Sequence, residues 1–143
     1  MRTIALTVLV MALSAATPLA ATSAPSAGLR ADTSRYGRIL FDSRGFVLYA
    51  FTADGRNRST CTGACAEAWP PYLVKQLPVS GPGAVRSLIG TTKRRDGSLQ
   101  VTYGGRPLYY YDGDRKPHQI LCQNVSEYGG LWLVVRGGGL PVK

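Results

Sequence analysis

Residues 99–111, LQVTYGGRPLYYY, contain the pattern that decides the fold. Two apolar runs rich in aromatic and β-branched residues flank Gly104-Gly105. This pair favours a tight turn, because glycine adopts a positive backbone φ without a steric penalty. Such a pattern predicts a β-hairpin. Residues 37–51, GRILFDSRGFVLYAF, predict a second hairpin with its turn at residues 42–45.

The two hairpins resemble each other. A shift of 60 positions aligns identical residues in both, and a shift of 63 then aligns two tryptophans. The aligned identities are Gly45 with Gly105, Leu48 with Leu108, Tyr49 with Tyr109, Asp54 with Asp114 and Trp69 with Trp132. Self-similarity at a fixed spacing predicts two copies of one supersecondary unit. We place these repeats at about residues 36–76 and 86–136.

The rest of the chain agrees with a small β domain. Its 143 residues fit one domain, and its 17 Gly and 9 Pro argue against a helical bundle. Residues 62–69, TGACAEAW, are the one helix candidate, and Pro70-Pro71 ends it. We therefore predict a single all-β domain at residues 36–143. It is mainly antiparallel and hairpin-based, with two pseudo-symmetric repeats, one short helix and long loops.

The first residues have the features of a secretory signal peptide. Arg2 precedes an apolar run at residues 4–13, and small residues follow. The run is shorter than the ~20 residues that a transmembrane helix needs. We predict a signal peptide at residues 1–21, a flexible lead-in at residues 22–35, and export to the periplasm or the exterior without a transmembrane segment.

The chain is strongly basic, with 17 Lys and Arg against 8 Asp and Glu and a net charge of +9. Such a charge favours anionic partners. Because an exported protein seldom meets nucleic acid, we expect an anionic envelope component or a protein as partner, and no nucleic acid. The one basic run, Lys93-Arg94-Arg95, precedes Asp96-Gly97 and predicts a solvated hairpin turn.

Both hairpins carry the pattern Y-x4-D, at residues 49–54 and 109–114. Together with C-x3-C at residues 61–65, WPP at residues 69–71 and RDG at residues 95–97, this pattern resembles the bacterial secreted-repeat family with the Y-x4-D motif, whose members are often predicted lipoproteins. The resemblance spans nearly all of the mature chain. It implies no known biochemical activity and brings no catalytic or ligand residues. The sequence lacks the lipoprotein cysteine near its cleavage site, which is a departure from that pattern.

The motif residues have two interpretations. In the structural one, the tyrosines face the core from their strands, and each Asp accepts backbone hydrogen bonds in a turn beside a glycine. In the other, the pseudo-symmetry brings Asp54 and Asp114 together as a carboxylate pair for cation binding or for hydrolysis. We expect the structural role for the set Tyr49, Asp54, Trp69, Tyr109, Asp114 and Trp132.

The three cysteines, Cys61, Cys65 and Cys122, predict one disulfide and one unpaired thiol in an exported protein. Their spacing does not decide which two are joined. The only histidine, His118, precedes Cys122 by four residues. The four side chains therefore form an alternative tetrahedral site for Zn or Cu. The disulfide implies no cofactor, whereas the metal site implies a redox or metal-handling protein.

Catalytic signals are absent from the sequence. It contains no G-x-S-x-G, H-E-x-x-H or P-loop pattern. We therefore expect a binding or structural module of the cell envelope or exterior, with an unknown ligand and no catalytic residues. The redox or metal-handling protein is the alternative.

Overall fold

The computed structural model describes residues 26–143, and the predicted signal peptide lies outside these residues. In chain order the elements are β1 (Gly28–Ser34), β2 (Gly37–Asp42), β3 (Tyr49–Phe51), α1 (Ala64–Ala68), β4 (Leu73–Val74), β5 (Val79–Ser80), the 3-10 helix η1 (Arg86–Leu88), β6 (Ile89–Lys93), β7 (Leu99–Tyr103), β8 (Arg106–Tyr109), β9 (Val125–Glu127) and β10 (Gly130–Val134). No helix within the described part of the chain has the length and apolar character to cross a membrane.

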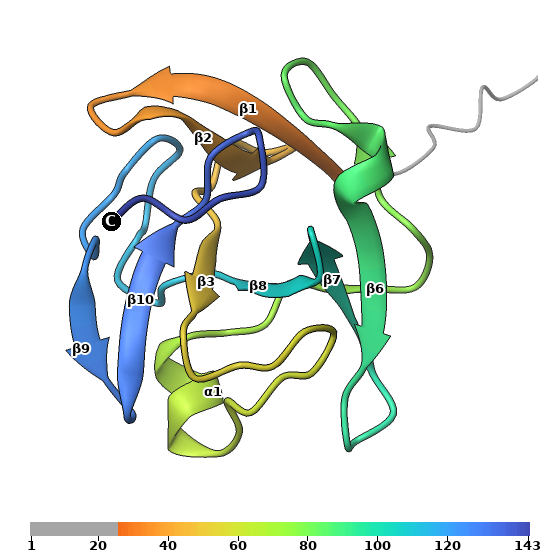
Figure 1. The fold of residues 1–143 in the computed structure, drawn as a ribbon, viewed down its shortest axis with the longest axis vertical. Helices are drawn as coiled ribbons and strands as arrows, with labels where there is room; N and C mark the ends of the chain where they lie inside the picture. The colour runs from red at the N-terminus through yellow and green to blue at the C-terminus, as the bar shows by residue number, and fades with distance from the viewer. Residues whose placement is uncertain (1–25) are drawn as a thin grey trace, which may run out of the picture.

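The described strands form two sheets (Figure 1). The larger sheet has the order β4-β7-β8-β3-β10-β9, with β6 also paired to β7, and the smaller has the order β2-β1-β5. All pairs are antiparallel except the short pair of β1 with β5. These sheets, the short helix α1 and the long loops confirm the predicted all-β class.

The two repeats meet at the pair formed by β3 and β8. There Tyr49 lies opposite Tyr109, its equivalent in the other repeat, so the local pseudo-two-fold axis passes between them. The closing segment of each repeat crosses to the other repeat's hairpin. Val134 pairs with Tyr49, and Pro71 forms a bridge to Tyr109. The repeats are therefore interlocked, because the hairpin of each repeat is paired with a segment that the other repeat supplies.

The strands at the centre of the larger sheet bury both of their faces. Along β3, Tyr49 and Phe51 belong to one apolar cluster and Ala50 to another, as the alternation of side chains in a strand requires. The first cluster also contains Trp69 and Trp132, which stack with their ring centroids 4.0 Å apart. The equivalent tryptophans of the two repeats thus form the centre of this cluster.

The folded domain begins earlier than the sequence predicted. The flexible lead-in at residues 22–35 is wrong from Gly28 onward, because β1 pairs with the whole length of β2. Leu29 and Ala31 are buried, while the side chains between and after them are less so. Burial of alternate residues stabilises this strand. With only two buried apolar side chains, its sequence shows little of the alternating pattern that predicts a strand.

The basic run at residues 93–95 forms the predicted turn, but Arg94 points inward. Its guanidinium donates hydrogen bonds to Ser59 Oγ, Gln100 Oε1 and the Cys61 carbonyl, each at 2.7 Å. The prediction of a fully solvated turn is therefore wrong for Arg94. Gln100 is completely buried, and its amide oxygen needs a donor that Arg94 supplies.

Candidate functional site

Each motif tyrosine donates a hydrogen bond to the motif aspartate of the other repeat. Tyr49 Oη lies 2.7 Å from Asp114 Oδ2, and Tyr109 Oη lies 2.6 Å from Asp54 Oδ2. Burial raises the pKa of both phenols, so that both remain protonated donors at neutral pH. These two reciprocal bonds link the repeats on either side of the pseudo-two-fold axis.

The second oxygen of each carboxylate also accepts hydrogen bonds. Asp54 Oδ1 accepts from the N–H and the hydroxyl of Thr60, at 2.7 and 2.8 Å. Asp114 Oδ1 accepts from the N–H of Leu121 at 2.9 Å. Burial raises the pKa of each carboxyl. Each carboxylate is hydrogen-bonded to a tyrosine of the other repeat, and Asp54 and Asp114 line two different hollows of the surface, which is not the paired arrangement of the hydrolase hypothesis.

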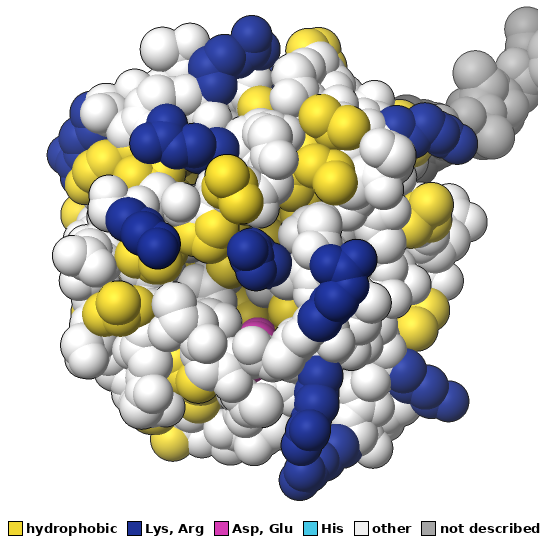
Figure 2. Space-filling view, in the orientation of Figure 1, with side chains coloured by type: hydrophobic (Ala, Val, Ile, Leu, Met, Phe, Trp, Pro, Cys, Tyr) yellow, Lys and Arg dark blue, Asp and Glu magenta, His cyan; other side chains and the backbone are white. Residues whose placement is uncertain are grey.

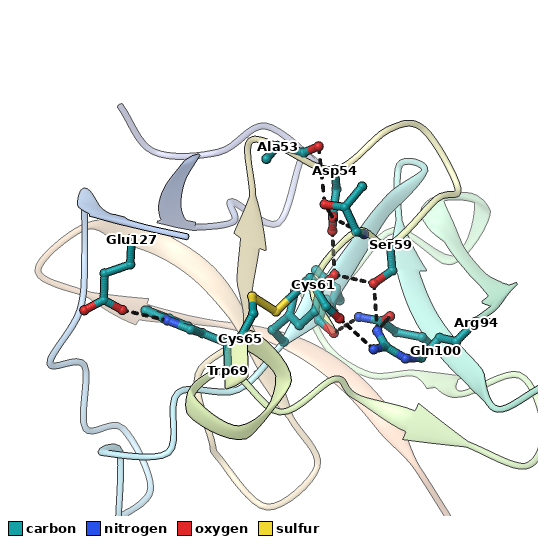
Figure 3. The surroundings of a disulfide bond; sticks show 12 residues. Ala53, Asp54, Ser59, Cys61, Cys65, Trp69, Arg94, Gln100 and Glu127 are labelled. Carbon is teal, nitrogen blue, oxygen red and sulfur yellow. Dashed lines mark hydrogen bonds between the residues drawn. A yellow bond between two sulfur atoms is a disulfide. The ribbon is translucent and has the colours of Figure 1, made fainter. Parts of the chain in front are cut away.

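Cys61 and Cys65 form a disulfide that fastens helix α1 to the preceding loop (Figure 3). Cys122 is a free thiol, half-buried, with a pKa raised by burial. One disulfide and one unpaired thiol are what the cysteine count predicted. The alternative four-ligand metal site is not formed, because two of its sulfurs, those of Cys61 and Cys65, are bonded to each other. Within residues 26–143 no group of three or more His, Cys, Asp or Glu side chains is placed to hold a metal ion.

His118 has a structural environment. Its ring packs against Phe41 with centroids 4.7 Å apart, and its backbone N–H donates to the Gly45 carbonyl at 2.8 Å. The equivalent place in the other repeat holds Asn57, whose N–H donates to the Gly105 carbonyl at 2.7 Å. Both residues have positive φ, 60° for His118 and 52° for Asn57. His118 is thus part of the repeated turn structure.

A cleft with a volume of about 880 Å³ opens beside β3. It is lined by the loop after β3, the turn between β7 and β8, and the segment after β10. Ala50, Pro107 and Leu133 are buried and provide apolar surface at its base. This volume lies within the range of ~300–1,000 Å³ typical of small-molecule sites, and the other described hollows are smaller.

Four exposed cationic side chains border the cleft: Arg56, Arg106, Arg136 and Lys143. Within the described residues none of them forms an ion pair. Asp54 is the only acidic residue among the described ones that line the cleft, and its oxygens are occupied as shown above. In Figure 2, Lys and Arg side chains surround exposed apolar ones on the face crossed by the C-terminal segment, and very little acidic surface is visible.

An equivalent hollow of about 330 Å³ lies beside the motif of the second repeat and is lined by residues of both repeats. The shift of 60 positions carries Ala50 onto Tyr110 and Asp54 onto Asp114, and all four residues line the hollow of their own repeat. The ring of Tyr110 occupies the place where Ala50 has only a methyl group. Its hydroxyl donates to Asp42 Oδ2 at 3.0 Å, which fixes the ring. The same place in the fold is therefore narrower beside Tyr110 and wider beside Ala50.

The two hollows also differ in charge. In the smaller one, Arg44 pairs with Asp42 at 2.8 Å and Arg115 pairs with Asp112 at 3.1 Å. Its positive charges are thus neutralised by the chain itself. The cations of the larger cleft have no such partners within the described residues. The acidic side chains of the described chain therefore leave these cleft cations without ion-pair partners.

A family model described as a secreted repeat of unknown function matches residues 31–72 and 90–136. The chain belongs to this secreted-repeat family. The two matched segments coincide with the two interlocked repeats, which confirms both the predicted duplication and the predicted family. Membership indicates that the chain is exported, and it assigns neither a ligand nor a reaction. Searches among curated proteins and among solved structures found no match.

The cleft of this secreted-repeat protein was missed by sequence reasoning. Arg56, Arg136 and Lys143 lie far apart in the sequence, and only the interlocking of the repeats brings them to one rim. The signal that could have found the cleft lies in the alignment of the repeats. Ala50 stands where the second repeat has Tyr110, and such a loss of volume in one copy indicates an opened hollow.

Proposed function

We propose that this exported protein is a binding module that takes an anionic ligand in the cleft beside β3. The single observation that carries this proposal is the contrast between the two equivalent hollows. One is narrowed by Tyr110 and its arginines are paired with nearby acids, whereas the other is wider at Ala50 and bordered by unpaired cations.

The chemistry of the cleft limits the ligand. A guanidinium binds a carboxylate or phosphate through two parallel hydrogen bonds, and three of the four cations are arginines. The base formed by Ala50, Pro107 and Leu133 offers no charged group to a ligand. The cleft therefore suits an anion that also carries an apolar part.

The proposal is tested with anilinonaphthalene sulfonate, an anionic aromatic probe whose fluorescence rises on binding. We expect saturable binding to the folded protein with one site per chain. Ala50→Tyr introduces the side chain that Tyr110 already has at the equivalent position, and it should reduce the affinity at least tenfold. Ala53→Tyr, at an exposed position outside the cleft, is the matched control and should bind like the wild type.

A second pair of variants separates the site from the overall charge. Arg106→Ala/Arg136→Ala removes two rim cations and should weaken probe binding about tenfold or more. Arg95→Ala/Lys116→Ala changes the net charge equally at exposed positions away from the cleft. Equal loss of binding in both double variants would contradict the proposal, as would probe binding that Ala50→Tyr leaves unchanged.

We also propose that residues 1–21 are the export signal. The secreted-repeat family supports export, and the sequence supports cleavage after Ala21. N-terminal sequencing of the protein from the extracytoplasmic fraction of its host should give Thr22 as the first residue. A first residue of Met1 in that fraction would contradict cleavage.

A further inference from the structure

We propose that the anion is the headgroup of a phospholipid, and that the cleft rim and the two turns beside it dock on an anionic membrane surface. We call these parts together the cleft face: the cleft, residues 83–88 and residues 136–140. This proposal rests on the proposed function, because it uses the same rim cations.

The cleft face presents apolar side chains that the described chain leaves uncovered. Leu140, at the cleft rim, is 66% exposed, and Val85, on the neighbouring turn, is 43% exposed. A soluble anion in the cleft leaves Val85 without a partner, because Val85 is not among the residues that line the cleft. The boundary between lipid headgroups and acyl chains accommodates apolar side chains and cations together.

The two turns form one supported platform. The hydroxyl of buried Tyr103 accepts a hydrogen bond from the Val85 N–H at 2.6 Å and donates one to the Gly137 carbonyl at 2.6 Å. The Leu88 side chain also lies against the backbone of Gly139, so closely that an added Cβ at Gly139 would be only 3.0 Å from Leu88 Cδ1. The two turns therefore pack directly on each other. Val85 and Leu140 are therefore presented from turns that are tied together, and their ordering costs little entropy on docking.

The charge of the cleft face complements an anionic bilayer. Arg56, Arg106, Arg136 and Lys143 border the cleft, and exposed Arg86 lies on the turn that carries Val85. Each basic residue held near an anionic membrane increases the affinity roughly fivefold, and salt weakens this attraction. Several cations beside two exposed apolar side chains supply the two signals that peripheral membrane attachment requires.

The test is co-sedimentation of the exported protein with vesicles of phosphatidylcholine, with or without phosphatidylglycerol. We expect binding only to the vesicles that contain phosphatidylglycerol, and a loss of binding at high salt. Leu140→Ser/Val85→Ser should weaken vesicle binding about tenfold. Val85→Ser alone lies outside the cleft lining; it should weaken vesicle binding severalfold and keep its affinity for anilinonaphthalene sulfonate within about twofold, because every residue that lines the cleft is intact.

The matched control is Leu77→Ser/Leu121→Ser, which replaces two leucines with exposures of 54% and 57% outside the cleft lining. It should bind vesicles like the wild type. The inference is overturned if this control loses as much vesicle binding as Leu140→Ser/Val85→Ser. It is also overturned if vesicles without phosphatidylglycerol bind equally well.

Three further outcomes separate this inference from the proposed function. If the sulfonate probe binds in the cleft but vesicles do not sediment the protein, membrane docking is wrong and the anion site stands. If inorganic phosphate at millimolar concentration binds in the cleft and vesicles do not, the ligand is a soluble anion. If vesicles bind while Ala50→Tyr leaves probe binding unchanged, the proposed cleft site is wrong and the headgroup is not bound there.

Discussion

Tyr49 and Tyr109 lie directly opposite each other in the pair formed by β3 and β8, and each donates its hydroxyl hydrogen to the aspartate of the other's motif. The tyrosine and the aspartate of one motif are therefore not bonded to each other; each is hydrogen-bonded to the motif of the other repeat. Asp54 is bonded to a tyrosine 55 positions later, and Asp114 to one 65 positions earlier. The motif spacing places each Asp at a loop where the other repeat's tyrosine can reach it.

Removing either hydroxyl should destabilise the fold. Tyr49→Phe leaves the buried Asp114 carboxylate without its phenol donor, and we expect a loss of about 2 kcal/mol in the free energy of unfolding, with a similar loss for Tyr109→Phe. Urea denaturation measures both. Tyr128→Phe, at a half-exposed side chain, is the control and should change stability by less than about 0.5 kcal/mol. Equal midpoints for Tyr49→Phe and Tyr128→Phe would contradict the structural role of the exchanged bonds.

Asp114 should give the protein a characteristic dependence of stability on pH. Burial raises the folded-state pKa of this carboxyl above the ordinary value of 3.8, so the folded state holds the proton more tightly than the unfolded chain. Its contribution favours folding below pH 3.8 and is lost as the pH rises through the raised pKa. The stability of the wild type relative to Asp114→Asn should therefore fall with pH in this window and become constant above it. Urea denaturation of both proteins across a pH series measures this difference in the free energy of unfolding. A difference that does not vary with pH would refute the prediction.

The thiol chemistry should distinguish Cys122 from the other cysteines. Under native, non-reducing conditions Cys61 and Cys65 are joined, so an alkylating reagent can add only at Cys122. Because this thiol is half-buried and its pKa is raised, the addition should be slow at neutral pH and faster at higher pH. Intact mass spectrometry should show one adduct before reduction and three after reduction in denaturant. Three adducts before reduction would show that the disulfide is absent.

Replacing Arg94 by lysine, which keeps the positive charge, should lower the stability of the protein. The Arg94 guanidinium reaches three acceptors at once, and a single lysine ammonium on a shorter, flexible side chain does not reproduce that fork. We expect Arg94→Lys to cost about 1–3 kcal/mol, because the buried oxygen of Gln100 loses a well-placed donor. Thermal or urea denaturation tests this against Arg95→Lys at the exposed neighbouring position, which should be nearly neutral. Similar losses in both variants would argue against the buried role of Arg94.

The sequence predicted the local structure well, because local signals determine it. Gly104-Gly105 indicated the hairpin between β7 and β8, Pro70-Pro71 indicated the end of α1, and the identities 60 positions apart indicated the duplication. Strand β1 was missed because only two apolar residues, Leu29 and Ala31, mark its buried face.

Long-range relationships could not be predicted in the same way. The alignment of the repeats shows which tyrosine corresponds to which, but it does not show that each one bonds to the aspartate of the other repeat. That exchange depends on the antiparallel register of Tyr49 with Tyr109. The cleft depends on the same register, because Arg56 and Arg106 come from opposite repeats.

The interlocking of the repeats also constrains when the chain can fold. The segment that closes the sheet beside β3 is β10, so the first repeat has no finished core until nearly the whole chain is available. Pairings between such distant residues make folding slow, in the range of milliseconds to seconds for β proteins. The two halves of the chain therefore have to close together around the stacked tryptophans, so that neither repeat completes its core before the other is present.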